Sequence, residues 1–249
     1  MFHIGSTKMI IAQISDTHLD PEDPKVSSRI LDLERCVADI NRIDPLPDVV
    51  IHTGDIAHNG TPTKYKEALR ILGRLRCPLY ISAGNRDDRG EIRRHFPQER
   101  YLLPDTQFIQ YTIEDFDVRL IALDTLSETT NMGSFCKVRA DSLRRTLAED
   151  CNKPTAIFMH HPPFEIKDSK FPLQFDTQEA ITILSNALDG QRNVIRAFCG
   201  HSHRDVTGNI SSVPASCVPS VAIDVRLGVF PQSFKTKPVY QIHKYNSHQ

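Results

Sequence analysis

Five short motifs in this sequence contain residue types that bind metal ions. They are Asp16-Thr17-His18, Gly54-Asp55, Gly84-Asn85-Arg86-Asp87, His160-His161 and Gly200-His201-Ser202-His203. This mixture of carboxylate, amide and imidazole groups suits transition metals such as Mn, Fe or Zn, whereas Ca and Mg prefer all-oxygen shells. Paired metals about 3.5–4 Å apart hold phosphoryl oxygens and generate hydroxide at neutral pH. The motifs therefore predict the hydrolysis of a phosphoester.

Each motif directly follows a short apolar run that is typical of a buried strand. The predicted strands cover residues 9–14, 48–52, 78–82, 154–159 and 194–199. In open α/β sheets, ligands bind at the carboxyl ends of the strands. We therefore expect seven metal ligands on one rim: Asp16, His18, Asp55, Asn85, His160, His201 and His203. Seven ligands can serve two metal ions if one carboxylate bridges them, and Asp55 is the natural bridge because it stands alone in its motif.

Between these strands, apolar residues recur at helical spacing. The pattern predicts helices over residues 27–43 and 63–76, and strands alternating with helices indicate βαβ units with a parallel sheet. The second half predicts a hairpin of 108–113 with 118–123, helices over 139–150 and 177–188, and several antiparallel strands from 206 onward. This last prediction rests on the valines and isoleucine at Val213, Val218, Val221, Ile223 and Val225. We find no repeat or linker and expect a single α/β domain over residues 1–249.

Composition limits the class of protein. The 249 residues have a formal net charge of −1, which gives no sign of a nucleic-acid polymer or a membrane surface as partner. Six cysteines form no CxxC pair, so we expect reduced thiols. The start of the chain lacks a signal-peptide core, and no stretch approaches the ~20 apolar residues of a membrane span. We expect a soluble, cytoplasmic protein, with a homodimer left open.

Taken in order, the motifs resemble the pattern DxH, GD, GNH(D/E), H and GHxH of the calcineurin-like metallophosphoesterase superfamily, over residues 9–205. The runs 84–89 and 160–163 look most like the class III cyclic-nucleotide phosphodiesterases, and the bacterial glycerophosphodiesterases are close to that group. The resemblance implies a four-layer αββα sandwich of two mixed β-sheets flanked by helices. It also implies two metal sites. The first contains Asp16, His18, Asp55 and His203, and the second contains Asp55, Asn85, His160 and His201.

Arg86 departs from the family pattern, which has a histidine at this position. In the family that histidine lies outside the metal shells, contacts the phosphate and is often assigned as the proton donor to the leaving group. Arginine keeps its proton up to a pKa above ~12, so it is no practical general acid, but it can hold phosphoryl oxygens and neutralise charge. We assign Asn85 and Arg86 as catalytic and substrate-binding residues. We also predict a preference for activated or strained diesters.

Three further histidines lie near the motifs. His58 follows Asp55 by three residues, and we leave two roles open: a substrate contact or a replacement proton donor. His161 follows His160 and should point to the other side of an extended chain. We therefore expect it in the pocket wall or behind His160, and count it among the candidate substrate-binding residues. His52, one residue before the Thr-Gly-Asp turn, is expected to pack or to support a ligand.

The sequence thus favours a dinuclear metallophosphodiesterase that contains two divalent or trivalent ions of Mn, Fe or Zn. Its expected substrates are small soluble phosphodiesters, with 2′,3′- or 3′,5′-cyclic nucleotides first, attacked by a metal-bridging hydroxide. The alternatives are a glycerophosphodiesterase, a broad phosphomonoesterase and a non-catalytic scaffold on the same fold. A scaffold has no chemical need for seven ligands, and this chain has all seven. A nuclease would need a basic stripe or stacking aromatics.

Overall fold

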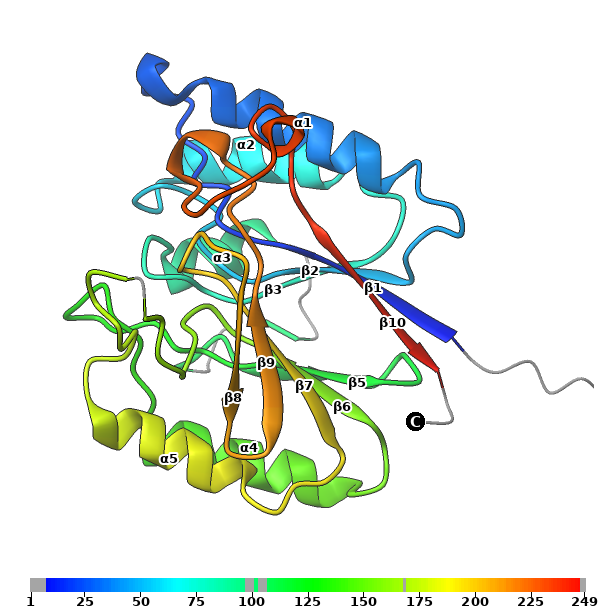
Figure 1. Ribbon diagram of the computed structural model, residues 1–249, viewed down its shortest axis with the longest axis vertical. Helices are drawn as coiled ribbons and strands as arrows, with labels where there is room; N and C mark the ends of the chain where they lie inside the picture. The colour runs from blue at the N-terminus through cyan, green and yellow to red at the C-terminus, as the bar shows by residue number, and fades with distance from the viewer. Residues whose placement is uncertain (1–7, 97–100, 103–106, 168, 247–249) are drawn as a thin grey trace, which may run out of the picture.

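The computed structural model describes residues 8–96, 101–102, 107–167 and 169–246. Within them, two β-sheets are stacked face to face and helices cover the outer face of each sheet (Figure 1). This arrangement confirms the predicted four-layer αββα sandwich. No helix in the described ranges is long and apolar enough to cross a membrane. All six cysteines are free, as expected.

The first sheet has the strand order β10-β1-β2-β3. Its strands are β1 (Lys8–Ile14), β2 (Val49–His52), β3 (Leu79–Ile81) and β10 (Gln241–Asn246). Strands β1, β2 and β3 run parallel and are covered on both faces, which explains their continuous apolar sequences. Helices α1 (Ser28–Ile40) and α2 (Pro62–Leu72) cover the outer face (Figure 1). The short helix α3 (Arg89–His95) follows β3.

The second sheet has six strands in the order β4-β5-β6-β7-β9-β8. They are β4 (Tyr111–Ile113), β5 (Arg119–Ala122), β6 (Thr155–Phe158), β7 (Val194–Cys199), β8 (Val206–Ile210) and β9 (Val213–Cys217). Helices α4 (Lys137–Glu149) and α5 (Gln178–Leu188) cover its outer face (Figure 1). The predicted hairpin is confirmed as the antiparallel pair β4 and β5, although both strands are shorter than expected.

The tail of the chain differs from the predicted run of antiparallel strands. Strands β8 and β9 do form an antiparallel pair, but β9 also pairs in parallel with β7. Beyond β9, Val218 and Val221 are buried in a loop, and Ile223–Val225 is a turn of 3-10 helix. This loop leaves the second sheet and binds the first, because the Val221 amide donates to the Ser15 carbonyl at 3.0 Å. The chain then ends on β10, an edge strand that pairs antiparallel with β1.

The two sheets are joined by polar contacts near the carboxyl ends of their central strands. The Gln13 amide on β1 donates to the carbonyl of Cys199 at the end of β7, at 2.9 Å, and both residues are fully buried. The ends of β1 and β7 are therefore held side by side. The loops that follow them start from one shared edge of the stacked sheets.

Candidate metal centre

The seven predicted ligands all lie in loops at this shared edge. Asp16 and His18 follow β1, Asp55 follows β2 and Asn85 follows β3. From the second sheet, His160 follows β6, and His201 and His203 follow β7. The carboxyl ends of parallel strands meet here, as the rule for open α/β sheets predicts. The structure brings all seven side chains together.

Three of the ligands form a first cluster. The Nε2 atom of His203 lies 3.2 Å from Oδ1 of Asp16, and Nε2 of His18 lies 3.7 Å from the same oxygen. The two imidazole nitrogens are 3.1 Å apart. One atom from each residue can therefore reach a single ion. This cluster joins the ends of β1 and β7.

A second cluster contains Asn85, His160 and His201. The Oδ1 atom of Asn85 lies 2.9 Å from Nδ1 of His201 and 3.1 Å from Nε2 of His160. The two histidine nitrogens are separated by 3.3 Å. The amide oxygen and both imidazoles thus point to one place.

Asp55 lies between the two clusters. Its Oδ2 atom is 3.6 Å from Nε2 of His18 in the first cluster and 3.5 Å from Nε2 of His160 in the second. Its other oxygen, Oδ1, accepts a hydrogen bond from the Arg86 backbone amide at 2.7 Å. One oxygen is therefore held by the protein while the other faces both clusters. This is the arrangement that a bridging carboxylate requires.

The backbone at the site is unusual. Five of the seven ligands have a left-handed conformation, with φ between 44° and 63°. The five are Asp16, His18, Asp55, His201 and His203. A non-glycine residue in this region costs about 1–3 kcal/mol and persists only where its surroundings hold it. Hydrogen bonds between the loops supply this restraint, since the amides of Asp16 and His18 donate to the carbonyls of Gly54 and Asp55 at 3.0 and 2.9 Å.

Two of the histidine rings are oriented by backbone carbonyls. Nδ1 of His160 donates to the Thr53 carbonyl at 2.7 Å, and Nδ1 of His203 donates to the Val225 carbonyl at 2.8 Å. In the neutral ring, a proton fixed on Nδ1 leaves the lone pair of Nε2 facing the site, where a bound cation would replace any second proton. His18 differs, because its Nδ1 is buried and has no hydrogen-bond partner in the described part of the chain.

The charges at the site compensate one another. Burial alone would raise the pKa of Asp55, but the neighbouring His160 and His18 hold that pKa well below its usual range. For Asp16 burial is likewise outweighed, chiefly by His203, and the pKa is again low. Burial opposes the charge on His160, yet Asp55 raises its pKa to about 9. Burial and then His160 lower the pKa of His201 to about 3. Both carboxylates are therefore ionised at neutral pH, while His201 is neutral.

The ligand atoms of the first cluster are arranged to bind a metal ion. Oδ1 of Asp16 is buried and has no hydrogen-bond partner among the residues that the structure describes. It faces Nε2 of His203, whose other nitrogen already binds the Val225 carbonyl. Two acceptors aimed at one another require a shared proton or a cation between them. Carboxylate, amide and imidazole ligands of this kind suit a transition-metal ion.

The two clusters open into a cavity of about 270 Å³. It is lined by five of the ligands, His18, Asp55, Asn85, His201 and His203, together with Arg29, His58, Arg86, Asn131 and Val225. The structure thus brings the predicted residues His58 and Arg86 to the cavity wall. The guanidinium of Arg86 lies 3.5 Å from Oδ1 of Asn59. Burial, followed by the charges of His18 and Arg86, lowers the pKa of His58.

His161 is not brought to the cavity wall. Its ring is buried, with Nδ1 2.9 Å from Oγ1 of Thr125 and Nε2 3.3 Å from the carbonyl of Asn131. The ring lies close to His160 and His201, but both of its nitrogens already have protein partners. Its position favours support of Asn131, which lines the cavity, over direct contact with a substrate.

Several residues near the motifs have supporting contacts. The fully buried ring of His52 lies 3.1 Å from Oγ1 of Thr17 and accepts from the Gly54 amide at 3.2 Å, as expected of a support residue. Asp88 caps α3 by accepting from the Glu91 amide. Asp87 instead accepts from the amides of Ile56 and Gly84, so it joins the second and third strand-end loops.

Sequence reasoning missed three residues of the cavity wall: Arg29, Asn131 and Val225. Arg29 lies on α1, where arginine is ordinary, and Asn131 lies in a polar loop. Val225 was assigned to a strand, although it belongs to the 3-10 turn beside His203. None of the three forms part of a ligand motif, so no local signal distinguishes them.

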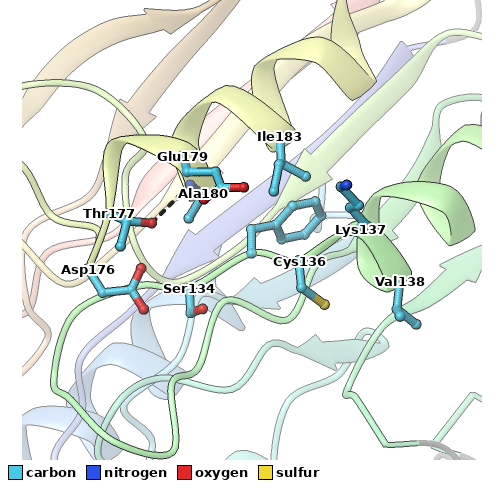
Figure 2. A pocket seen from close by; sticks show the side chains of 10 residues that line it. Ser134, Cys136, Lys137, Val138, Asp176, Thr177, Glu179, Ala180 and Ile183 are labelled. Carbon is cyan, nitrogen blue, oxygen red and sulfur yellow. Dashed lines mark hydrogen bonds between the residues drawn. The ribbon is translucent and has the colours of Figure 1, made fainter.

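A second cavity, of about 430 Å³, lies where α4 and α5 begin (Figure 2). Figure 2 shows Cys136, Lys137, Asp176, Thr177 and Glu179 around it. None of the seven predicted ligands lines this cavity. The chemistry described above therefore belongs to the smaller cavity at the strand ends.

Comparison with known families gives a match across most of the chain. A family model described as calcineurin-like phosphoesterase matches residues 9–205. This range begins in β1 and ends just beyond His203, and so contains all seven predicted ligands.

Two curated relatives are similar over much of their length. The probable glycerophosphodiester phosphodiesterase GpdQ of Arcobacter nitrofigilis is 31% identical over 97% of this chain and 90% of its own. A probable cyclic nucleotide phosphodiesterase of Rhodopseudomonas palustris is 31% identical over 73% of this chain and 66% of its own. Among solved structures, GAP50, the anchor in the inner membrane complex of Plasmodium, matches with a TM-score of 0.65. It is 13% identical and covers 95% of this chain and 81% of its own, which is a likeness of fold alone.

Proposed function

Because the chain belongs to the calcineurin-like phosphoesterase family, we propose that it is a phosphodiesterase with a dinuclear metal centre. The observation that carries this proposal is the position of Asp55. One of its oxygens lies within 3.6 Å of a histidine from each cluster, while the other is held by the Arg86 amide. A single carboxylate shared by two ligand clusters is what two closely spaced ions need.

Under this proposal, Asp16, His18, Asp55 and His203 hold the first ion, and Asp55, Asn85, His160 and His201 hold the second. Two bound ions supply Lewis acidity toward phosphoryl oxygens and lower the pKa of water to near neutrality. The protein contributes the geometry, since the carbonyls of Thr53 and Val225 fix two imidazole rings before any ion arrives.

The cavity wall supplies the contacts to the substrate. Arg86 and His58 lie on it beside the ligands, and a guanidinium group is a cation that can form two hydrogen bonds to phosphoryl oxygens. We assign Arg86 to hold a phosphoryl oxygen and neutralise the charge that develops in the transition state. His58 contacts the ester or donates the proton that Arg86 cannot supply.

The size of the cavity favours a small substrate. At about 270 Å³ it lies just below the range for small-molecule sites, about 300–1,000 Å³. Small diesters are also what the names of the two curated relatives imply for those proteins. We therefore propose two substrate classes, cyclic nucleotides and glycerophosphodiesters. The relative from Rhodopseudomonas palustris supports the first class, and the relative from Arcobacter nitrofigilis supports the second equally.

The test is metal reconstitution followed by hydrolysis of nitrophenyl phosphates. A chelated sample should be inactive, bind two equivalents of Mn²⁺ and then cleave bis-nitrophenyl phosphate faster than mono-nitrophenyl phosphate. Cyclic nucleotides and glycerophosphodiesters compared at equal concentration would then identify the substrate class. A protein that binds two ions but hydrolyses none of these esters would contradict the proposal and support a scaffold. Faster monoester hydrolysis would support a phosphomonoesterase.

A further inference from the structure

Arg29 lines the cavity beside the first cluster and contacts the backbone of one of its ligands. It lies on α1, is only 7% exposed, and donates from Nη1 to the carbonyl of His18 at 3.1 Å. Its other nitrogens bind the carboxylate of Asp224, with Nε at 2.9 and 3.0 Å from the two oxygens and Nη2 at 2.6 Å from one. One planar guanidinium therefore joins three parts of the chain: α1, the loop of His18 and the loop after β9.

His18 depends on its backbone for its position. Its Nδ1 has no hydrogen-bond partner in the described ranges, unlike Nδ1 of His160 and His203, and its backbone has φ 44°. The His18 amide donates to the Asp55 carbonyl at 2.9 Å, and its carbonyl accepts from Arg29. Among the described residues, the guanidinium thus supplies one of the two hydrogen bonds to the backbone of this strained residue.

Asp224, the carboxylate partner of Arg29, lies next in sequence to the residue that orients His203, the other histidine of the first cluster. Asp224 precedes Val225, whose carbonyl fixes the ring of His203. We call residues 220–227 the C-terminal strap. The strap makes two further hydrogen bonds to residues of the first cluster. Oγ of Ser220 donates to the Asp16 carbonyl at 2.7 Å, and the amide of Leu227 donates to the His203 carbonyl at 2.9 Å.

We infer that Arg29 is a positioning residue for the first metal site, where it holds His18 directly and the C-terminal strap through Asp224. The inference rests on the proposed dinuclear centre. It predicts an effect on one site only, because the hydrogen bonds of Arg29 reach no residue of the second cluster. Loss of a residue that orients a metal ligand typically weakens metal affinity about 10–100-fold.

The test compares Arg29→Lys with a matched control, Arg119→Lys. Arg119 is equally buried, at 2% exposed, and has the same kinds of partners: the Glu114 carboxylate at 2.6 Å and the carbonyls of Thr146 and Asp150. It begins β5, at the end of the strand away from the metal centre. Lysine keeps the charge but cannot form the fork of contacts. Metal-free proteins are titrated with Mn²⁺ by calorimetry, without substrate, and folding is checked by thermal unfolding.

Wild type and Arg119→Lys should each bind two ions. Arg29→Lys should keep one site unchanged and bind the other about 10–100-fold more weakly. Unchanged affinity at both sites, or equal weakening of both, would overturn the inference. If Arg29→Lys does not fold, the same Mn²⁺ titration is made on Asp224→Asn, with the same expected result: one site unchanged and one weakened. A wild type that binds fewer than two ions would instead count against the proposed function.

Discussion

Position 86 contributes to the site through its backbone and its side chain separately. The Arg86 amide holds Oδ1 of Asp55, a contact that any residue other than proline can make. The guanidinium lies on the cavity wall. A change of side chain therefore alters the contact with substrate without dismantling the proposed bridge.

This separation makes Arg86→His an informative variant. A protonated imidazole can donate the proton that arginine retains and become neutral, and a lost general acid typically costs about 10²–10⁴-fold for a poor leaving group. We expect the variant to raise kcat/KM for unstrained alkyl diesters while changing little for bis-nitrophenyl phosphate or 2′,3′-cyclic nucleotides. Steady-state kinetics on the matched ester pairs measures the difference. Equal rates for wild type and variant on alkyl diesters would contradict it.

The metal ligands could be predicted from the sequence, whereas the residues that position them could not. The seven ligands could be found because each stands in a short motif directly after an apolar strand. Arg29 and Asp224 could not, since they are 195 positions apart and act together only after the strap folds back. Their contact is a property of the tertiary structure, and each residue alone is typical of a solvated surface.

At the level of elements, the strand-end loops pack so closely that side chains are excluded. Gly84 follows β3 and approaches the Asp55 loop, where an added Cβ would overlap the Asp55 amide and Oδ1. Gly200 likewise approaches Ser15 and Asp16. At both positions the close approach of the loops leaves no room for a side chain.

We therefore expect Gly84→Ala to displace Asp55. Overpacking of a well-packed region costs about 1–3 kcal/mol, and here it should also weaken both metal sites because they share the carboxylate. Gly90→Ala, in the first turn of α3, is the control, because its Cβ would approach the side-chain Oδ1 of Asp88 at 3.1 Å and no backbone atom of a strand-end loop. Urea unfolding and Mn²⁺ titration of both variants give the comparison. Two intact metal sites in Gly84→Ala would show that the loops can separate.

Most of the elements could be predicted because apolar periodicity decides them locally. One exception is β10, whose largely polar sequence QIHKYN is half-buried, with Lys244 and Asn246 exposed, as suits an edge strand. It forms because β1 offers an unpaired edge, more than 220 residues away, from Lys8 paired with Asn246 to Gln13 paired with Gln241. Ile223 and Val225 give the opposite error, a predicted strand where the structure has a 3-10 turn. Their apolar spacing suggests a strand, but the contacts of the strap to Asp16 and His203 impose a turn.

For the molecule as a whole, burial of neutral histidines makes stability depend on pH. Burial lowers the pKa of His52 to about 3, whereas the unfolded chain titrates near ~6.5. Between these values the unfolded chain binds a proton that the folded chain does not. The contribution of His52 to the free energy of unfolding therefore falls as the pH decreases from ~6.5 toward 3.

His52→Asn tests this linkage, since asparagine can still accept from the Gly54 amide but does not titrate. In metal-free protein, we expect its free energy of unfolding to change less between pH 6 and pH 4 than that of wild type. The difference in slope should approach ~1.4 kcal/mol per pH unit, the value for one proton. Urea unfolding at several pH values measures it. Parallel pH profiles would mean that His52 is protonated in the folded chain.

The left-handed backbone at five ligands has a consequence for how such a protein can change over generations. Each of these positions is a point of local frustration, where glycine or asparagine would suit the conformation better than the residue present. A homologue that no longer bound the ions could gain stability when these ligands are replaced. We therefore expect substitutions in such a homologue to accumulate at these five positions first. The complete set is thus a stability burden that only continued use of the site would maintain.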